Sequence, residues 1–133
     1  GWHSDGALLF PNGLLGLYGT AWTRDNHKLD VLATDQAWAE EALAQKAYDQ
    51  TGLRVIPLPY LVLMKIDSAR GIDQGDLTRM LGLLDDAAIE RVVAVVERHY
   101  GDPHAAEDVR QYAKLGAMEY WTPDDPADDH HAT

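Results

Sequence analysis

The stretch LPYLVLMKIDSARGIDQGDLTRMLGLL, residues 58–84, decides how the rest of the chain can be arranged. Apolar residues fill most of positions 60–69, which is typical of a helix covered on most sides. Pro59 suits the first helical position because the N–H it lacks would have no partner there, and Gly71 suits the residue just past a helix end. Asp76 falls in the first turn of a following helix, where a negative charge is favourable. The stretch therefore predicts two helices separated by a break at Gly71.

The sequence before this stretch predicts a small antiparallel sheet. Three short apolar runs cover residues 7–10, 14–18 and 27–33, and Pro-Asn-Gly at residues 11–13 is a turn signal between the first two. Strand geometry places alternate residues of the third run on opposite faces. One face would carry Leu29, Val31 and Ala33, and the other Lys28, Asp30 and Leu32. We expect about three strands, with the first two forming a hairpin.

Helical patterns account for most of the remaining chain. One helix is expected from Thr34 or Asp35 to about Asp49, one after Asp85, and one from Asp102 and Pro103 onward. In the last of these helices, small residues at 113 and 116 would let a neighbouring helix come close. The helix after Asp85 has one apolar face, formed by Ile89, Val92, Val93 and Val96. Together with the central pair, these helices give an α+β fold in which a small antiparallel sheet precedes a four- to five-helix C-terminal part. We expect residues 1–121 to form a single domain. Residues 122–133 carry no apolar face, which predicts a disordered acidic tail.

Composition limits the kind of protein. The chain has 133 residues, is 46% hydrophobic and 25% charged, and carries a net charge of −11. A protein that binds nucleic acid mainly through phosphates needs a basic stripe, so nucleic acid is not an expected partner. No apolar run approaches the ~20 residues that span a bilayer, and we expect a cytoplasmic protein without membrane contact. The absence of cysteine from the sequence excludes disulfides and thiolate nucleophiles.

Lys65, Arg70, Asp73, Asp76 and Leu77 follow the spacing K-x-x-x-x-R-x-x-D-x-x-D-L. This pattern resembles the C-terminal motif of the abortive-infection-type nucleotidyltransferase toxins and their relatives. The resemblance implies a sheet that carries a Gly-Ser turn and a D-x-D or D-x-E pair for metal and nucleotide phosphates. A later Lys and Asp, from a helical half, complete such a site. On this resemblance Lys65 and Arg70 would bind the nucleotide, and Asp76 would be a catalytic acid.

The sheet half of that family pattern is not visible in the sequence. No Gly-Ser precedes a D-x-D or D-x-E pair, although Asp30 takes the place of the later acid on the sheet and would be catalytic by the same resemblance. We therefore expect an N-terminally incomplete, degenerate or truncated nucleotidyltransferase-like domain that binds a nucleotide or a protein partner without turnover. Mg²⁺ would accompany the nucleotide, and no dedicated metal-ligand set is predicted.

Two other functions fit the same residues. The chain could be an active nucleotidyltransferase whose acidic pair lies upstream of Gly1 or on another chain. It could instead be an acidic interaction module, as in toxin–antitoxin pairs, that occupies a basic protein partner. The open reading frame upstream of Gly1 would separate the active enzyme from the other two.

Each candidate residue also has a purely structural interpretation. Asp30 could be a solvent-exposed acid paired with Lys28 or Arg24. Lys65 could form a structural salt bridge, since burying an unpaired ammonium in an apolar helix is costly. Asp76 could simply stabilise a helix N-terminus. Arg70 and Asp73 could form a clamp between the two helices.

The predicted sheet is small for an independent one, and its outer strands would have open edges. We therefore expect a homodimer that forms through a sheet edge or through the exposed face of the sheet.

Overall fold

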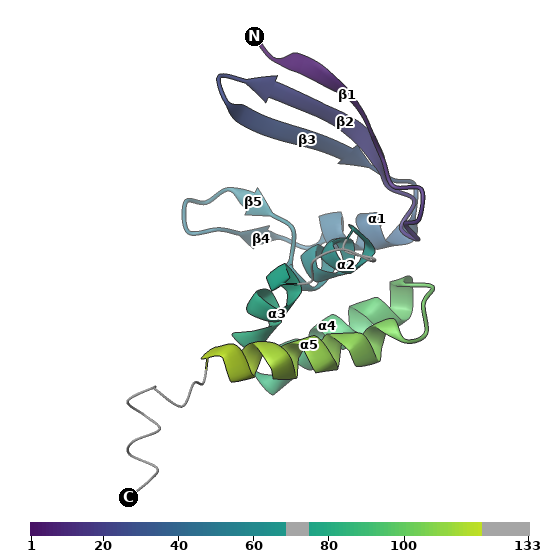
Figure 1. Ribbon diagram of the computed structural model, residues 1–133, viewed down its shortest axis with the longest axis vertical. Helices are drawn as coiled ribbons and strands as arrows, with labels where there is room; N and C mark the ends of the chain where they lie inside the picture. The colour runs from purple at the N-terminus through teal and green to yellow at the C-terminus, as the bar shows by residue number, and fades with distance from the viewer. Residues whose placement is uncertain (69–74, 121–133) are drawn as a thin grey trace, which may run out of the picture. The chain divides into compact units, whose positions relative to one another are not determined.

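The computed structural model describes residues 1–68 and 75–120 and has the predicted α+β fold. Within these residues, a three-stranded antiparallel sheet comes first and five helices follow, with a two-stranded hairpin between the first and second helix (Figure 1). The chain divides into two compact units, Gly1–Arg70 and Gly71–Thr133. The expected break at Gly71 and the expected tail at 122–133 lie outside the described residues.

The sheet of the first unit has the order β1-β2-β3, formed by β1 (His3–Leu9), β2 (Tyr18–Arg24) and β3 (His27–Ala33). A two-residue turn joins β2 to β3, and both of its residues have positive φ, 48° at Asp25 and 66° at Asn26. This is the type I′ geometry that matches the twist of a hairpin. Gly19 lies in the middle strand where a Cβ would be 2.1 Å from the carbonyl oxygen of Val31, so only glycine fits.

The predicted second strand, residues 14–18, is wrong except for its last residue. Leu15 is fully buried, and its backbone N–H points to the carboxylate of Asp67 at 3.4 Å. The Leu14 N–H is bound by the same carboxylate at 2.7 Å. Because a side chain from a later helix takes these backbone groups, residues 14–17 form part of a long connection and the strand starts only at Tyr18.

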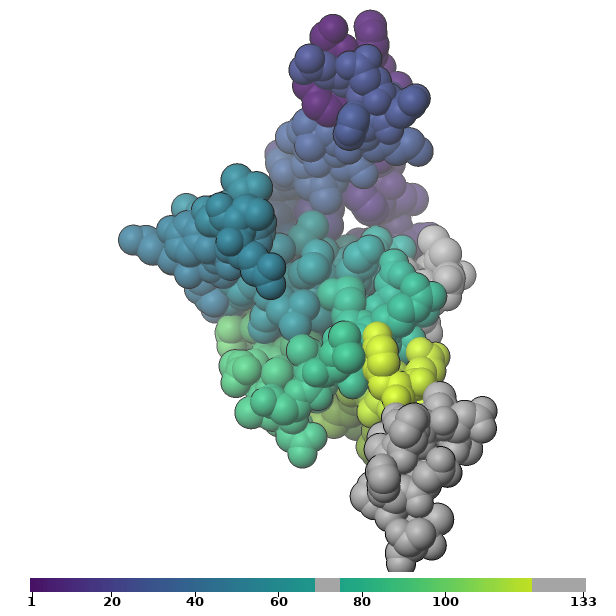
Figure 2. Space-filling model, turned by 90° about the vertical axis from the view of Figure 1, so that its left-hand side faces the viewer, coloured from purple at the N-terminus to yellow at the C-terminus, as the bar shows by residue number. Residues whose placement is uncertain are grey.

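The predicted helix from Thr34 or Asp35 to Asp49 is shorter in the structure. Helix α1 covers Ala37–Ala44, and the chain then forms a hairpin of β4 (Ala47–Tyr48) and β5 (Arg54–Val55). The Asp49 carboxylate organises the turn by accepting hydrogen bonds from the backbone N–H of Thr51 at 2.8 Å and of Leu53 at 3.0 Å. Figure 2 shows this hairpin standing out from the surface of the first unit.

Helix α2 (Leu58–Ser68) follows the hairpin and matches the first predicted central helix. Its residues Tyr60, Val62 and Leu63 are at most 1% exposed and form the core of the first unit with Leu15 and Trp38. In Figure 1, α1 and α2 lie beyond the end of the sheet where β3 finishes. The sheet itself is thinly covered, since no residue of its three strands is fully buried.

The described part of the second unit, residues 75–120, is helical and contains α3 (Gly75–Gly82), α4 (Asp86–His99) and α5 (Ala105–Tyr120). The predicted apolar face of α4 is confirmed by the burial of its members at i, i+3, i+4 and i+7: Ile89, Val92, Val93 and Val96. Asp85 caps this helix as predicted, because its carboxylate accepts a hydrogen bond from the N–H of Ala88 at 2.8 Å.

Helices α3 and α5 meet through two glycines. A Cβ on Gly116 would lie 1.8 Å from the Thr78 carbonyl oxygen, and one on Gly82 would lie 2.4 Å from the Gly116 carbonyl carbon. The expectation that small residues at 113 and 116 let a neighbouring helix approach is confirmed at 116. Helix α5 begins at Ala105 rather than at the predicted Pro103, although Asp102 does accept a hydrogen bond from the His104 N–H at 2.9 Å. No helix within residues 1–68 and 75–120 is long and apolar enough to cross a membrane.

Candidate functional site

A pocket of about 550 Å³ lies in the first unit, next to the end of the sheet. The sheet end contributes Leu32, α1 contributes Trp38, β5 contributes Val55 and α2 contributes Met64. Its walls are mainly apolar, and its volume falls in the range of about 300–1,000 Å³ that is usual for small-molecule sites. Four different elements therefore converge on a space large enough for a ligand.

Few polar side chains line this pocket. Arg54 is the one charged residue among them, and its guanidinium donates a hydrogen bond to the Leu43 carbonyl oxygen. Gln45 also lines the pocket and donates through Nε2 to the Tyr60 hydroxyl at 2.7 Å. That hydroxyl in turn donates to Glu41 at 2.6 Å. The polar part of the pocket is thus held in place by contacts among α1, β5 and α2.

The wall formed by α1 is fixed to the connection after β1. Trp38 is 3% exposed and donates a hydrogen bond from its indole Nε1 to the Leu15 carbonyl oxygen at 3.2 Å. The Thr34 hydroxyl donates to the same oxygen at 2.9 Å. These bonds join Trp38 of α1, and Thr34 just before it, to a fully buried leucine, so the pocket wall is fixed at its base.

Asp67 is the buried acid of the first unit, with 5% of its side chain exposed. It lies near the C-terminal end of α2 and accepts hydrogen bonds from the Leu14 and Leu15 backbone N–H groups. A carboxylate that receives backbone N–H groups can be buried without the full penalty of an unpaired charge. We interpret Asp67 as an anchor that holds the 14–17 connection on α2.

The described residues expected from the sequence to form a site belong to different elements. Asp30 is exposed on β3, and Lys65 is partly buried on α2, where it is not among the residues that line the pocket. Asp76 is exposed in the first turn of α3 and forms an ion pair with Arg79 at 3.8 Å. Arg70 lies outside the described residues. The nucleotide-binding and catalytic roles of these four residues stay predictions.

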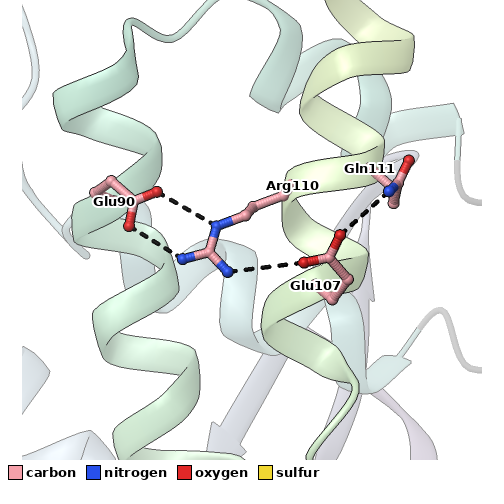
Figure 3. A network of polar contacts seen from close by, with 4 residues as sticks. All are labelled: Glu90, Glu107, Arg110 and Gln111. Carbon is pink, nitrogen blue, oxygen red and sulfur yellow. Dashed lines mark hydrogen bonds and ion pairs between the residues drawn. The ribbon is translucent and has the colours of Figure 1, made fainter.

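The second unit carries a polar network between α4 and α5 (Figure 3). Arg110 bonds both carboxylate oxygens of Glu90, at 3.4 and 3.2 Å, and Glu107 lies 3.8 Å from the same guanidinium. Gln111 donates to Glu107 at 3.2 Å. Hydrogen bonding to Glu90 and its charge raise the pKa of Arg110 above its usual value. The network joins two helices at an exposed surface, so we assign it a structural role.

Metal-binding side chains do not gather in the described part of the chain. No group of three or more His, Asp or Glu residues there is placed to hold a metal ion.

A scan against protein-family models and searches of curated proteins and of solved structures found no match to this chain. The resemblance based on residues 65–77 therefore rests on the sequence pattern alone.

Sequence reasoning missed both the pocket and the role of Asp67 as the anchor of the 14–17 connection. The signal for Asp67 was present, since it follows Tyr60 and Leu63 at i+7 and i+4 on the buried face of α2. Arg54 could not be found this way, because the two-residue strand β5 is too short to show a period.

Proposed function

We propose that this chain is a nucleotidyltransferase-like binding domain that does not turn over nucleotides by itself, and that its ligand lies in the pocket of the first unit. The observation that carries the ligand site is an apolar pocket of about 550 Å³ with a single guanidinium, that of Arg54, among its lining residues. The sequence pattern at residues 65–77 supports the nucleotidyltransferase-like class.

Nucleotidyl transfer needs carboxylates close enough to share divalent cations. The described residues hold no cluster of three acids or histidines that could do this. Asp76 is paired with Arg79 of its own helix, and Asp30 is an exposed residue on an outer strand. These placements favour binding over turnover.

The chemistry of the pocket favours a ligand with an apolar body and one carboxylate. Apolar walls from α1, α2 and the sheet end would take the body of the ligand, because burying apolar surface is favourable in proportion to its area. A guanidinium has five N–H donors, and a carboxylate can take two of them side by side. A triphosphate would require several cationic groups, whereas the lining residues supply only Arg54.

Thermal unfolding with three matched ligands tests this assignment. Decanoate, decanol and decyltrimethylammonium have linear alkyl tails of nearly the same length, and their head groups are anionic, neutral and cationic. Decanoate at about 100 times its dissociation constant should stabilise the protein by about 2.7 kcal/mol. At the same concentration, decanol should stabilise the protein less than decanoate does, and the cationic compound should leave the melting temperature unchanged. Equal shifts from all three ligands, or none from any, would overturn the proposed ligand class.

Variants connect the effect to the pocket. Arg54→Gln should remove the advantage of decanoate over decanol, while Ala39→Leu, which fills the pocket from α1, should weaken both. Arg24→Gln is the matched control, because Arg24 is an exposed arginine of the same unit that does not line the pocket. Decanoate binding that survives Arg54→Gln unchanged would argue against a role for this guanidinium.

A nucleotide is the second candidate ligand, favoured by the spacing of Lys65, Arg70 and Asp76. ATP or GTP with Mg²⁺ should then raise the melting temperature, and Lys65→Ala should abolish that shift at a modest cost in stability. If Lys65 has only a structural role, the wild-type protein will show no shift with any nucleotide, while Lys65→Ala will still lower the melting temperature.

Absence of turnover is tested separately. Incubation with Mg²⁺ or Mn²⁺, labelled nucleoside triphosphates and mixed protein and RNA acceptors should give no labelled product. A labelled product that disappears with Asp30→Ala would show an active enzyme and refute this part of the proposal.

A further inference from the structure

The outer strand β3 has a regular, open edge. In the order β1-β2-β3, the two outer strands each have a neighbour on one side only within the described residues. The pairing of β1 with β2 is interrupted by a register shift between Ser4 and Gly6, and such a bulge discourages further pairing. By contrast, β3 pairs with β2 at all of its residues from His27 to Ala33 without a shift. The edge most suited to accept another strand is therefore that of β3.

The hairpin turn determines which residues of β3 offer their backbone groups at this edge. The i to i+3 hydrogen bond of a two-residue turn joins the residues that flank it, here Arg24 and His27. Residues in an antiparallel pair alternate between bonding to one neighbour and to the other. His27 bonds inward to β2, so Lys28, Asp30 and Leu32 offer their N–H and C=O groups outward.

These three residues also share one face of the sheet, and that face has opposite charges two positions apart. Antiparallel pairing of β3 with the β3 strand of a second copy allows three registers in which Asp30 lies opposite one of these three residues of the partner strand. In one, Asp30 meets Asp30 of the partner subunit, which is unfavourable because like charges lie directly opposite. In another, Asp30 meets an apolar leucine. In the third, Lys28 meets Asp30 of the partner subunit, and the two-fold axis repeats this pair.

We propose that the partner of this edge is a second copy of the chain, paired through β3 in the register that places Lys28 opposite Asp30 of the partner subunit. Leu29 then lies on the two-fold axis, opposite Leu29 of the partner subunit, in the kind of pair whose side chains approach most closely. Leu29 is 45% exposed and Val31 51% exposed in the single chain, so pairing covers apolar surface on the opposite face of the sheet. The dimer has a continuous six-stranded sheet, a common size for a sheet.

This interface is small. Edge pairing of one seven-residue strand buries less than the ~800 Å² per partner of a standard protein interface. The dimer should accordingly be in equilibrium with the monomer and should be measured across a concentration series.

Charge reversal tests both the interface and its register. Analytical ultracentrifugation of the wild-type chain should show a rise from 14.7 kDa toward twice that mass with concentration. In a homodimer of either single variant, Lys28→Asp or Asp30→Lys, like charges lie opposite one another at both symmetry-related pairs. Each variant should therefore raise the dissociation constant of the dimer by at least about tenfold. An equimolar mixture of these two variants restores both opposite-charge pairs and should form a heterodimer. The double variant Lys28→Asp/Asp30→Lys should again form a homodimer.

Matched charge changes elsewhere serve as controls. Glu119→Lys and Lys114→Asp change the net charge by the same amounts at exposed positions on α5 and should dimerise like the wild type. Recovery on mixing also shows that the two single variants are folded. A wild-type monomer at every concentration, single variants that dimerise normally, or a mixture that stays monomeric would each overturn the proposal.

Discussion

The two units of this protein are stabilised by different means. In the second unit, α4 buries a stripe of aliphatic side chains, and α3 and α5 approach closely at Gly82 and Gly116. In the first unit, hydrogen bonds between segments distant in sequence are prominent, such as those from Leu14 and Leu15 to Asp67. The second unit should therefore be sensitive to changes in side-chain volume. The first should be sensitive to the loss of particular polar groups.

The largest effect is expected from Gly116→Ala in the second unit. An exposed helical glycine replaced by alanine gains about 0.5–1 kcal/mol. Here the added Cβ would lie 1.8 Å from the Thr78 carbonyl oxygen, so α3 and α5 must separate. We expect destabilisation by about 3 kcal/mol, at the upper end of ordinary overpacking. Urea unfolding, with hydrogen exchange to assign the loss to α3 and α5, would measure it.

Ala117→Gly is the control for this prediction because Ala117 is exposed on the same helix. It should cost about 1 kcal/mol through helix propensity alone. If Gly116→Ala stabilised the protein, the close glycine contact between the helices would be refuted.

Asp67→Ala tests the first unit. The change removes the acceptor for the Leu14 N–H, a bond of 2.7 Å, and leaves buried donors without a partner. Each such group costs about 1–3 kcal/mol, and we expect a loss of about 2 kcal/mol in total. Faster hydrogen exchange should appear at residues 14–17 and in α1, because the Leu15 carbonyl oxygen also accepts the Trp38 indole N–H.

Asp67→Asn retains one acceptor oxygen with nearly the same shape, and its cost should be smaller than that of Asp67→Ala. Equal losses for the two variants would mean that packing of the side chain, rather than its hydrogen bonds to the backbone, holds the connection.

Asp85→Ala provides a smaller, local test in the second unit. The carboxylate caps α4 through the Ala88 N–H at 2.8 Å. Loss of an N-cap typically costs about 1 kcal/mol. Asp85→Ser, which keeps a capping oxygen, should recover most of this loss in thermal unfolding, and no recovery would indicate that the cap contributes through its charge alone.

The sequence predicted the second unit better than the first, and the reason lies in the range of the interactions. The α4 stripe and the Asp85 cap depend on residues at most seven positions apart, so they are visible as a local period. The start of β2 depends on Asp67, which bonds to Leu14 across 53 positions. No local pattern around residue 14 records that contact.

The candidate site was missed for the same reason, because it depends on contacts between segments that are distant in the sequence. The α4 helix is built from one segment, whereas the pocket draws on the sheet end, α1, β5 and α2, which the fold alone brings together. Lys65 was predicted to bind a nucleotide, yet the pocket is lined by its neighbour Met64. Asp30 was singled out as an acid in an apolar strand, and its position at the open edge of β3 supports a role in pairing.

The smallest expected effect is a pH response of the hairpin between β4 and β5. Hydrogen bonding to the Thr51 side chain, with further bonds from the Leu53, Thr51 and Gly52 backbone, lowers the pKa of Asp49 below its usual 3.8. A carboxylate whose pKa is lower in the folded state than in the unfolded state stabilises the fold. This stabilisation is fully present at pH values above the unfolded-state pKa, and it is lost as the pH falls through the folded-state pKa. The hairpin should therefore keep its turn above the usual pKa of 3.8 and loosen only in more acidic solution. Following the Leu53 amide by NMR should give a transition midpoint below 3.8, and Asp49→Asn should abolish it. A midpoint above 3.8 would mean that the turn does not favour the ionised carboxylate.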